Sequence, residues 1–143
     1  MEPLIAYLHY LSIILLAGFL VGELVMCRAG MTTEQARRLA GIDAVFFASA
    51  LAALATGLLR LFLYAKGVSF YTGNPTFWVK MALYVIIAVI SITPTRWKRA
   101  AAERGAAPAG DEIAAARRLI HIELGLLALM PLMAVLMARG IGR

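Results

Sequence analysis

The sequence predicts an all-α protein, a four-transmembrane-helix bundle that forms a single integral membrane domain over residues 1–143. The chain is 62% hydrophobic and only 15% charged, and its mean hydropathy is +0.83. Soluble domains are about 45–50% apolar and about 25% charged, and so short a globule cannot bury this much apolar surface in one core. Since each transmembrane helix needs about 20 apolar residues, four helices with short connections use the whole chain.

Four apolar segments are the expected membrane spans, because a bilayer requires a spanning segment to satisfy its backbone hydrogen bonds as a helix. They cover residues 4–26, 42–64, 77–93 and 119–138. We expect the first segment to be retained rather than cleaved as a signal peptide. Glu2 stands where a basic leader is usual, and Cys27-Arg28 is a poor cleavage site. Cys27, the single cysteine, is expected to be a structural thiol.

The connections between the spans differ in character. Thr32-Thr33-Glu34-Gln35 resembles a capping box, so the second helix is expected to begin ahead of its apolar segment. The third helix is expected to end before Pro94. Residues 100–110, rich in Ala, Gly and Pro, are typical of a mobile linker, and residues 67–76 are typical of a turn-rich loop.

The distribution of basic residues predicts the orientation. Nine Lys and Arg residues lie in the loops after the first and third spans: Arg28, Arg37, Arg38, Arg96, Lys98, Arg99, Arg104, Arg117 and Arg118. Three lie in the middle loop and the C-terminal tail: Lys66, Arg139 and Arg143. Because loops rich in Lys and Arg stay in the cytoplasm, we expect an N-out/C-out, multi-pass protein of a bacterial inner membrane.

Ionisable residues at membrane depth are costly and indicate function, and here they form two layers. The outer layer contains His9, Arg60 and Lys80, with Tyr10 and Trp78 nearby. A neutral His9 imidazole can ligate a metal or a haem iron, and the two cations can hold haem propionates or quinone carbonyls. In the alternative reading, His9 is a packing residue and both cations extend to the lipid headgroups.

The inner layer contains Glu23, Asp43, His121 and Glu123. It can form a proton relay, or a structural set of ion pairs with basic residues at the ends of the spans. The candidate structural partners are Arg37, Arg38, Arg117 and Arg118. The only two histidines, His9 and His121, differ in expected depth by about 20 Å, so we do not expect them to ligate one haem together.

Several segments resemble a bacterial membrane family that is described only as a domain of unknown function. They are Tyr7-Leu-His9-Tyr10, Gly22-Glu23-Leu, Arg37-Arg-Leu-Ala-Gly-Ile-Asp43-Ala-Val, Thr56-Gly-Leu-Leu-Arg60, Asn74-Pro-Thr-Phe-Trp78-Val-Lys80, Arg117-Arg-Leu-Ile-His-Ile-Glu123 and Met137-Ala-Arg-Gly-Ile-Gly142. The resemblance covers nearly the whole chain and implies no particular activity.

A more distant resemblance is to the HemJ-type protoporphyrinogen oxidases and the CopD-type copper-resistance membrane proteins. His9, Thr56-Gly57 and Lys80 occupy places that match a HemJ-type His, Thr-Gly pair and Lys. This resemblance implies haem b binding by His9 and a membrane oxidoreductase in which Lys80 takes part. The fourth span differs from the HemJ pattern.

The leading functional hypothesis is therefore a redox protein that binds haem b or another planar cofactor near the outer leaflet. The catalytic residues stay unassigned. The alternatives are an accessory subunit of a larger membrane complex and a small transporter. The small residues Gly18 and Gly22 suit close helix packing, either within the chain or in a homo-oligomer. The basic loops lack a nucleic-acid-binding module, so their expected partner is the lipid bilayer.

Overall fold

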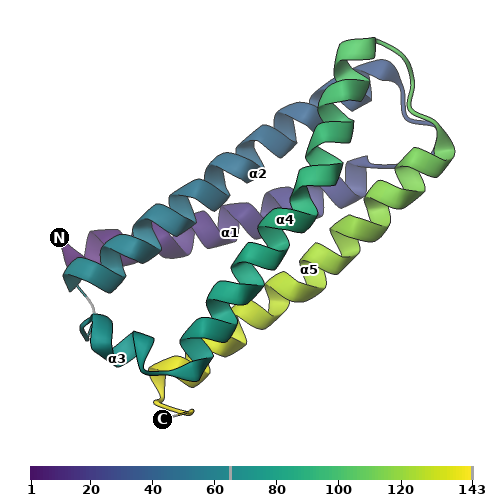
Figure 1. The fold of residues 1–143 in the computed structure, drawn as a ribbon. Coiled ribbons are helices and arrows are strands. Elements are labelled where there is room, and N and C mark those ends of the chain that lie inside the picture. Colours follow the sequence, from purple (N-terminus) through teal and green to yellow (C-terminus); the bar gives the residue numbers. More distant parts are fainter. Residues whose placement is uncertain (65, 143) are drawn as a thin grey trace.

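The computed structural model describes residues 1–64 and 66–142, and it is made of helices (Figure 1). In chain order they are α1 (Glu2–Met26), α2 (Thr33–Leu59), the π-helix η1 (Arg60–Tyr64), α3 (Val68–Thr72), α4 (Pro75–Arg104) and α5 (Gly110–Ala138). α1, α2 with η1, α4 and α5 are each long and apolar enough to cross a membrane. The predicted all-α bundle of four long helices is confirmed.

The predicted start of the second helix is also confirmed. α2 begins at Thr33, ahead of the apolar segment. Its cap is a full capping box, in which Thr32 Oγ1 accepts from the Gln35 amide at 3.3 Å and Gln35 Oε1 accepts from the Thr32 amide at 2.9 Å. These two bonds satisfy amides that a helix N-terminus leaves unpaired.

The expected end of the third helix before Pro94 is wrong. α4 continues through Pro94 to Arg104 and ends at Gly105, whose φ of +62° suits glycine. A proline removes one helical hydrogen bond, and membrane helices tolerate that loss when neighbouring groups compensate. The predicted linker over 100–110 is consequently shorter, because only residues 105–109 lie between α4 and α5.

The loop between η1 and α4 is partly helical, which the turn-rich composition did not predict. α3 occupies Val68–Thr72, between Gly67 with a φ of +94° and Gly73. The glycines at its ends supply the turns, and the five residues between them contain neither Gly nor Pro.

The four long helices run alternately up and down, with α1 beside α2 and α4 beside α5 (Figure 1). The turns at residues 27–32 and 105–109 lie together at one end, which we call the closed end. The N-terminus, α3 and the C-terminal residues lie toward the other end, the open end. The two helix pairs meet at the closed end and diverge toward the open end.

Side-chain burial is likewise greater toward the closed end. The buried side chains of the long helices lie between Ser12 and Glu23 on α1, between Ala36 and Ala53 on α2, between Ile87 and Ala101 on α4, and between Ile113 and Glu123 on α5. Within the described part of the chain, α4 before Ile87 and α5 after Glu123 have none. The packed core therefore occupies the closed half of the bundle.

The small residues of α1 are not used to bring helices together within the chain. A Cβ added at Gly18 or at Gly22 would meet no atom within 4 Å. Of the two alternatives for this pair, the structure does not support packing within the chain. Contact with a second copy stays a prediction.

Candidate functional site

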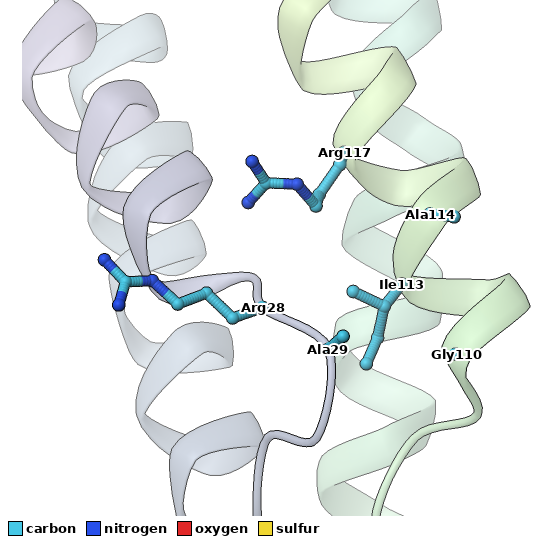
Figure 2. A pocket seen from close by; sticks show the side chains of 6 residues that line it. All are labelled: Arg28, Ala29, Gly110, Ile113, Ala114 and Arg117. Atoms are coloured by element: carbon cyan, nitrogen blue, oxygen red, sulfur yellow. The ribbon is translucent and has the colours of Figure 1, made fainter.

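A cavity of about 370 Å³ lies at the closed end, between the α1–α2 turn and the start of α5 (Figure 2). It is lined by Arg28, Ala29, Gly110, Ile113, Ala114 and Arg117. Arg117 Nη1 donates to Leu24 O at 2.8 Å and to Cys27 O at 2.5 Å, and Arg28 Nε donates to Val25 O at 2.7 Å. Both arginines thus cap α1, where cations also stabilise the negative end of the helix dipole.

Cys27 is fully buried beside these contacts and is a free thiol. Burial raises the pKa of the Cys27 thiol, so the group stays protonated and unreactive at neutral pH. Its position at the end of α1 agrees with a packing role.

Replacing Arg117 by glutamine is expected to lower the free energy of unfolding by about 1.5–3 kcal/mol, the usual contribution of hydrogen bonds to a charged group. The loss follows because two carbonyls at the end of α1 lose their donor. Thermal unfolding in detergent, followed by helical circular dichroism, measures the change. Arg118→Gln is the matched control, because Arg118 is exposed on the next position of α5. An equal loss in both variants would contradict the assignment.

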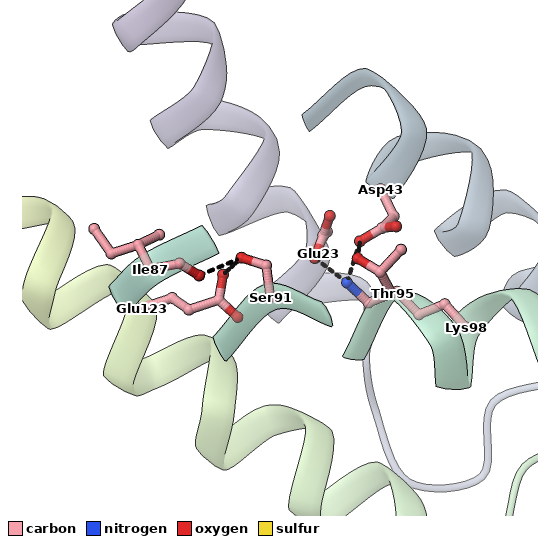
Figure 3. Close-up of polar contacts among 7 residues, drawn as sticks. All are labelled: Glu23, Asp43, Ile87, Ser91, Thr95, Lys98 and Glu123. Atoms are coloured by element: carbon pink, nitrogen blue, oxygen red, sulfur yellow. Dashed lines mark hydrogen bonds and ion pairs between the residues drawn. The ribbon is translucent and has the colours of Figure 1, made fainter. Parts of the chain in front are cut away.

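A buried carboxylate network lies deeper in the closed half (Figure 3). We use this name for Glu23, Asp43, Ser91, Thr95, Lys98 and Glu123. The Lys98 ammonium donates to Glu23 Oε2 and, at 2.8 Å, to Asp43 Oδ1. Thr95 Oγ1 donates to Asp43 Oδ1 at 3.0 Å. Glu23, Asp43, Lys98 and Glu123 are each at most 2% exposed, so the charges sit in the protein interior and not among headgroups.

The second part of the network joins α4 to α5. Ser91 Oγ lies 2.8 Å from Glu123 Oε2 and 2.8 Å from Ile87 O. His121 is not part of this arrangement. It is exposed, and its Nδ1 lies 2.8 Å from Arg117 O on its own helix. Three of the four residues predicted for the inner layer therefore come together and the fourth does not.

The partners predicted for the structural reading of this layer are wrong. Glu23 and Asp43 pair with Lys98, which sequence reasoning treated as a loop charge. Arg38 instead pairs with Glu34 on the surface of α2 at 3.3 Å. Lys98 was missed because the third helix was ended at Pro94. In the structure the buried residues of α4 recur every three or four positions: Ile87, Ser91, Pro94, Lys98 and Ala101. This periodicity includes Lys98 only once the helix is known to continue past Pro94.

His9 lies in the open half, against α2. Its Nδ1 is 3.0 Å from Ala53 O and 3.0 Å from Thr56 Oγ1. A carbonyl oxygen only accepts, so the ring hydrogen sits on Nδ1. Thr56 fits this assignment, because its hydroxyl donates to Ala52 O at 2.6 Å and leaves its oxygen free to accept. Nε2 has no hydrogen-bond partner among the described residues.

Gly57 provides the space for this ring. A Cβ added at Gly57 would lie 3.1 Å from His9 Cε1, closer than side chains usually pack. Thr56 and Gly57 thus fix the orientation of the imidazole in two ways. The Thr56 hydroxyl oxygen accepts a hydrogen bond from it, and Gly57 leaves room for the ring because it has no side chain.

The two predicted cations lie in the same region. The Arg60 guanidinium stands 5.4 Å from the centre of the Tyr10 ring, and Arg60 opens the π-helix η1, a rare element that often marks functional sites. Lys80 and Arg60 both act electrostatically on His9, and Arg60 also acts on Lys80. Neither cation has an acidic partner among the described residues.

Trp78 is not part of this cluster. Its Nε1 donates to Thr72 O at 2.9 Å, and its ring contacts Phe77 at 5.4 Å between centroids. It is 58% exposed, which suits an aromatic residue at a membrane interface. The residues that the structure brings together at the open end are therefore His9, Tyr10, Thr56, Arg60 and Lys80.

Within residues 1–64 and 66–142, no group of three or more His, Cys, Asp or Glu side chains is arranged to hold a metal ion. His9 by itself offers one nitrogen. A metal at this position would consequently need most of its ligands from a cofactor.

A comparison with protein families finds a match over residues 1–142 to the family described as Predicted membrane protein (DUF2214). No curated protein and no solved structure matches the chain, so these comparisons do not support the resemblance to HemJ-type and CopD-type proteins. The family match covers all four long helices, the open-end cluster and the buried carboxylate network. The chain belongs to the DUF2214 family of predicted membrane proteins.

Proposed function

We propose that the protein is a membrane redox protein that binds haem b, or a similar planar cofactor, at the open end with His9 Nε2 as the ligand. The observation that supports this most strongly is the hydrogen bond from His9 Nδ1 to Ala53 O. Histidines that ligate metals usually donate their other ring N–H to a carbonyl or carboxylate, which fixes the tautomer and the ring orientation. The resemblance to HemJ-type proteins implies the same ligand.

Arg60 and Lys80 complement this ligand. Two cations without acidic partners are costly at membrane depth, and an anionic group between them would offset that cost. Haem carries two propionates, and Arg binds carboxylates in a bidentate manner. Arg60 and Lys80 would hold the propionates, Tyr10 lies beside Arg60, and haem, when bound, would supply one-electron transfer.

The divergence of the two helix pairs supports the placement. The open half lacks the buried side chains that fill the closed half, so a planar cofactor there would not have to displace a packed core. Arg28 lies in the turn after α1, and Arg99 and Arg104 lie at the end of α4, so the closed end is rich in basic residues. The positive-inside rule therefore favours a cytoplasmic closed end. The site then faces the outer leaflet of a bacterial inner membrane, with both termini outside.

The absorbance spectrum of protein purified from cells supplied with haem precursor tests this function. We expect a Soret band in the wild type and its loss in His9→Ala. His121→Ala is the matched control and should keep the band, because His121 is exposed on the other half of the bundle. A wild-type preparation that shows no band and takes up no added haem would refute the proposal.

Substitution of the two cations tests the proposed haem site in a second way. Arg60→Gln and Lys80→Gln are expected to keep the Soret band while weakening haem affinity, because they remove partners of the propionates and not the iron ligand. Haem titration of the purified variants measures the dissociation constants. Unchanged affinity in both variants would remove the cations from the site.

A further inference from the structure

The buried carboxylate network carries more negative charge than its surroundings neutralise. It contains three carboxyl groups, Glu23, Asp43 and Glu123, and one ammonium, Lys98. Arg117 of α5 is bonded instead to backbone carbonyls at the end of α1. A buried ionised carboxylate without a compensating charge costs several kcal/mol, and such a group takes up a proton instead.

The two contacts of Ser91 provide a place for one such proton. A serine hydroxyl has a single hydrogen, but Ser91 Oγ lies 2.8 Å from two oxygens, Ile87 O and Glu123 Oε2. When Glu123 is protonated, its O–H donates to Ser91 Oγ and the Ser91 O–H donates to Ile87 O, so both contacts are hydrogen bonds. When Glu123 is ionised, the Ser91 O–H turns to Glu123 Oε2.

Two buried oxygens of the network have no partner. Glu23 Oε1 and Asp43 Oδ2 are inaccessible and accept no hydrogen bond within the described residues. Their sister oxygens both bind the Lys98 ammonium, which balances only one of the two carboxylates (Figure 3). Within the described residues nothing satisfies these two oxygens. The Glu23–Asp43 pair therefore keeps uncompensated negative charge in the network, and this charge favours a proton on the third carboxyl, Glu123.

We propose that the buried carboxylate network is a proton-binding site, in which Glu123 carries a proton at neutral pH and releases it to solvent hydroxide at alkaline pH, while the Ser91 hydroxyl rotates between the two hydrogen-bonded states. The charged and titratable groups around it are Lys98 from α4, Asp43 from α2, Glu23 and the Cys27 thiol on the α1 side, and Arg117 from α5. The site does not depend on the proposed haem.

The infrared spectrum tests the proposal, because the C=O stretch of a protonated carboxyl is separate from the carboxylate bands. Purified wild type is expected to show this stretch at neutral pH and to lose it at alkaline pH. Glu123→Gln should lack it. Glu103→Gln, which removes an exposed carboxyl of α4, is the matched control and should keep it.

A second variant keeps the test valid if Glu123→Gln does not fold. Ser91→Ala removes the acceptor of the Glu123 proton, so the stretch should persist but change frequency. An absent stretch in the wild type at neutral pH, an unchanged stretch in Glu123→Gln, or an unshifted stretch in Ser91→Ala would each overturn the proposal. A merely structural glutamate–serine contact with an ionised Glu123 would give the first of these results.

Discussion

Replacing Lys98 by methionine is expected to lower the free energy of unfolding by about 3–5 kcal/mol, the usual loss when one partner of a buried ion pair is removed. Lys98 is 2% exposed and, among residues 1–64 and 66–142, is the only ammonium bonded to Glu23 and Asp43. Without it, two carboxylates from α1 and α2 face each other at the centre of the closed half. Denaturation in mixed micelles, followed by helical circular dichroism, measures the loss.

Arg99→Met is the matched control for this prediction, because Arg99 is the next residue of α4 and is exposed. A triple variant adds Glu23→Gln and Asp43→Asn to Lys98→Met. It should recover most of the stability, since replacing a whole buried ion pair by neutral groups is often nearly neutral. The prediction would be contradicted by a Lys98→Met protein as stable as the wild type, or by a triple variant less stable than Lys98→Met. Either result would show that the ion pairs of Lys98 do not determine stability in the closed half.

Gly57→Ala is expected to weaken cofactor binding at the open end by about 10- to 100-fold, the usual effect of disturbing the groups that orient a metal-ligating histidine. The new Cβ would stand 3.1 Å from His9 Cε1, so the ring must move away from Ala53 O. The helix itself should not be weakened, because alanine favours helices more than glycine does. Haem titration, with His9→Ala as the lower limit, measures the effect.

Gly125→Ala makes the same chemical change at a helical glycine where an added Cβ meets nothing within 4 Å. It should bind as the wild type does. Equal binding by Gly57→Ala and Gly125→Ala would mean that the imidazole does not need its present position. Loss of binding in both, with unchanged helix content, would point to a general effect on the bundle.

The sequence was sufficient for the number and approximate position of the four long helices, because hydrophobicity over about 20 residues decides membrane insertion. The start of α2 was predictable for a local reason, since the Thr32–Gln35 capping box is written in four consecutive residues. The end of α4 was not, because whether a helix continues past Pro94 depends on neighbouring helices that the local sequence does not describe.

The residues of the candidate sites likewise include some that the sequence reveals and one that it does not. His9, Arg60 and Lys80 could be recognised because a charge or imidazole within an apolar segment is conspicuous. Lys98 could not, since it stands among Arg96, Arg99 and Arg104 and resembles them in composition. Only the fold distinguishes it, by turning Lys98 inward to Glu23 and Asp43 while Arg96 and Arg99 remain exposed.

The confinement of the packed core to the closed half has a mechanical consequence. The separation of the α1–α2 pair from the α4–α5 pair at the open end can change without breaking core contacts, because the buried side chains of these helices lie elsewhere. Such opening is opposed by the hydrogen bond of 2.7 Å from Tyr84 Oη on α4 to Ala50 O on α2, and we expect the lateral pressure of the surrounding acyl chains to oppose it as well. We therefore expect bilayer thickness and acyl saturation to tune the width between the helix pairs, and amide exchange to be faster there than near Lys98.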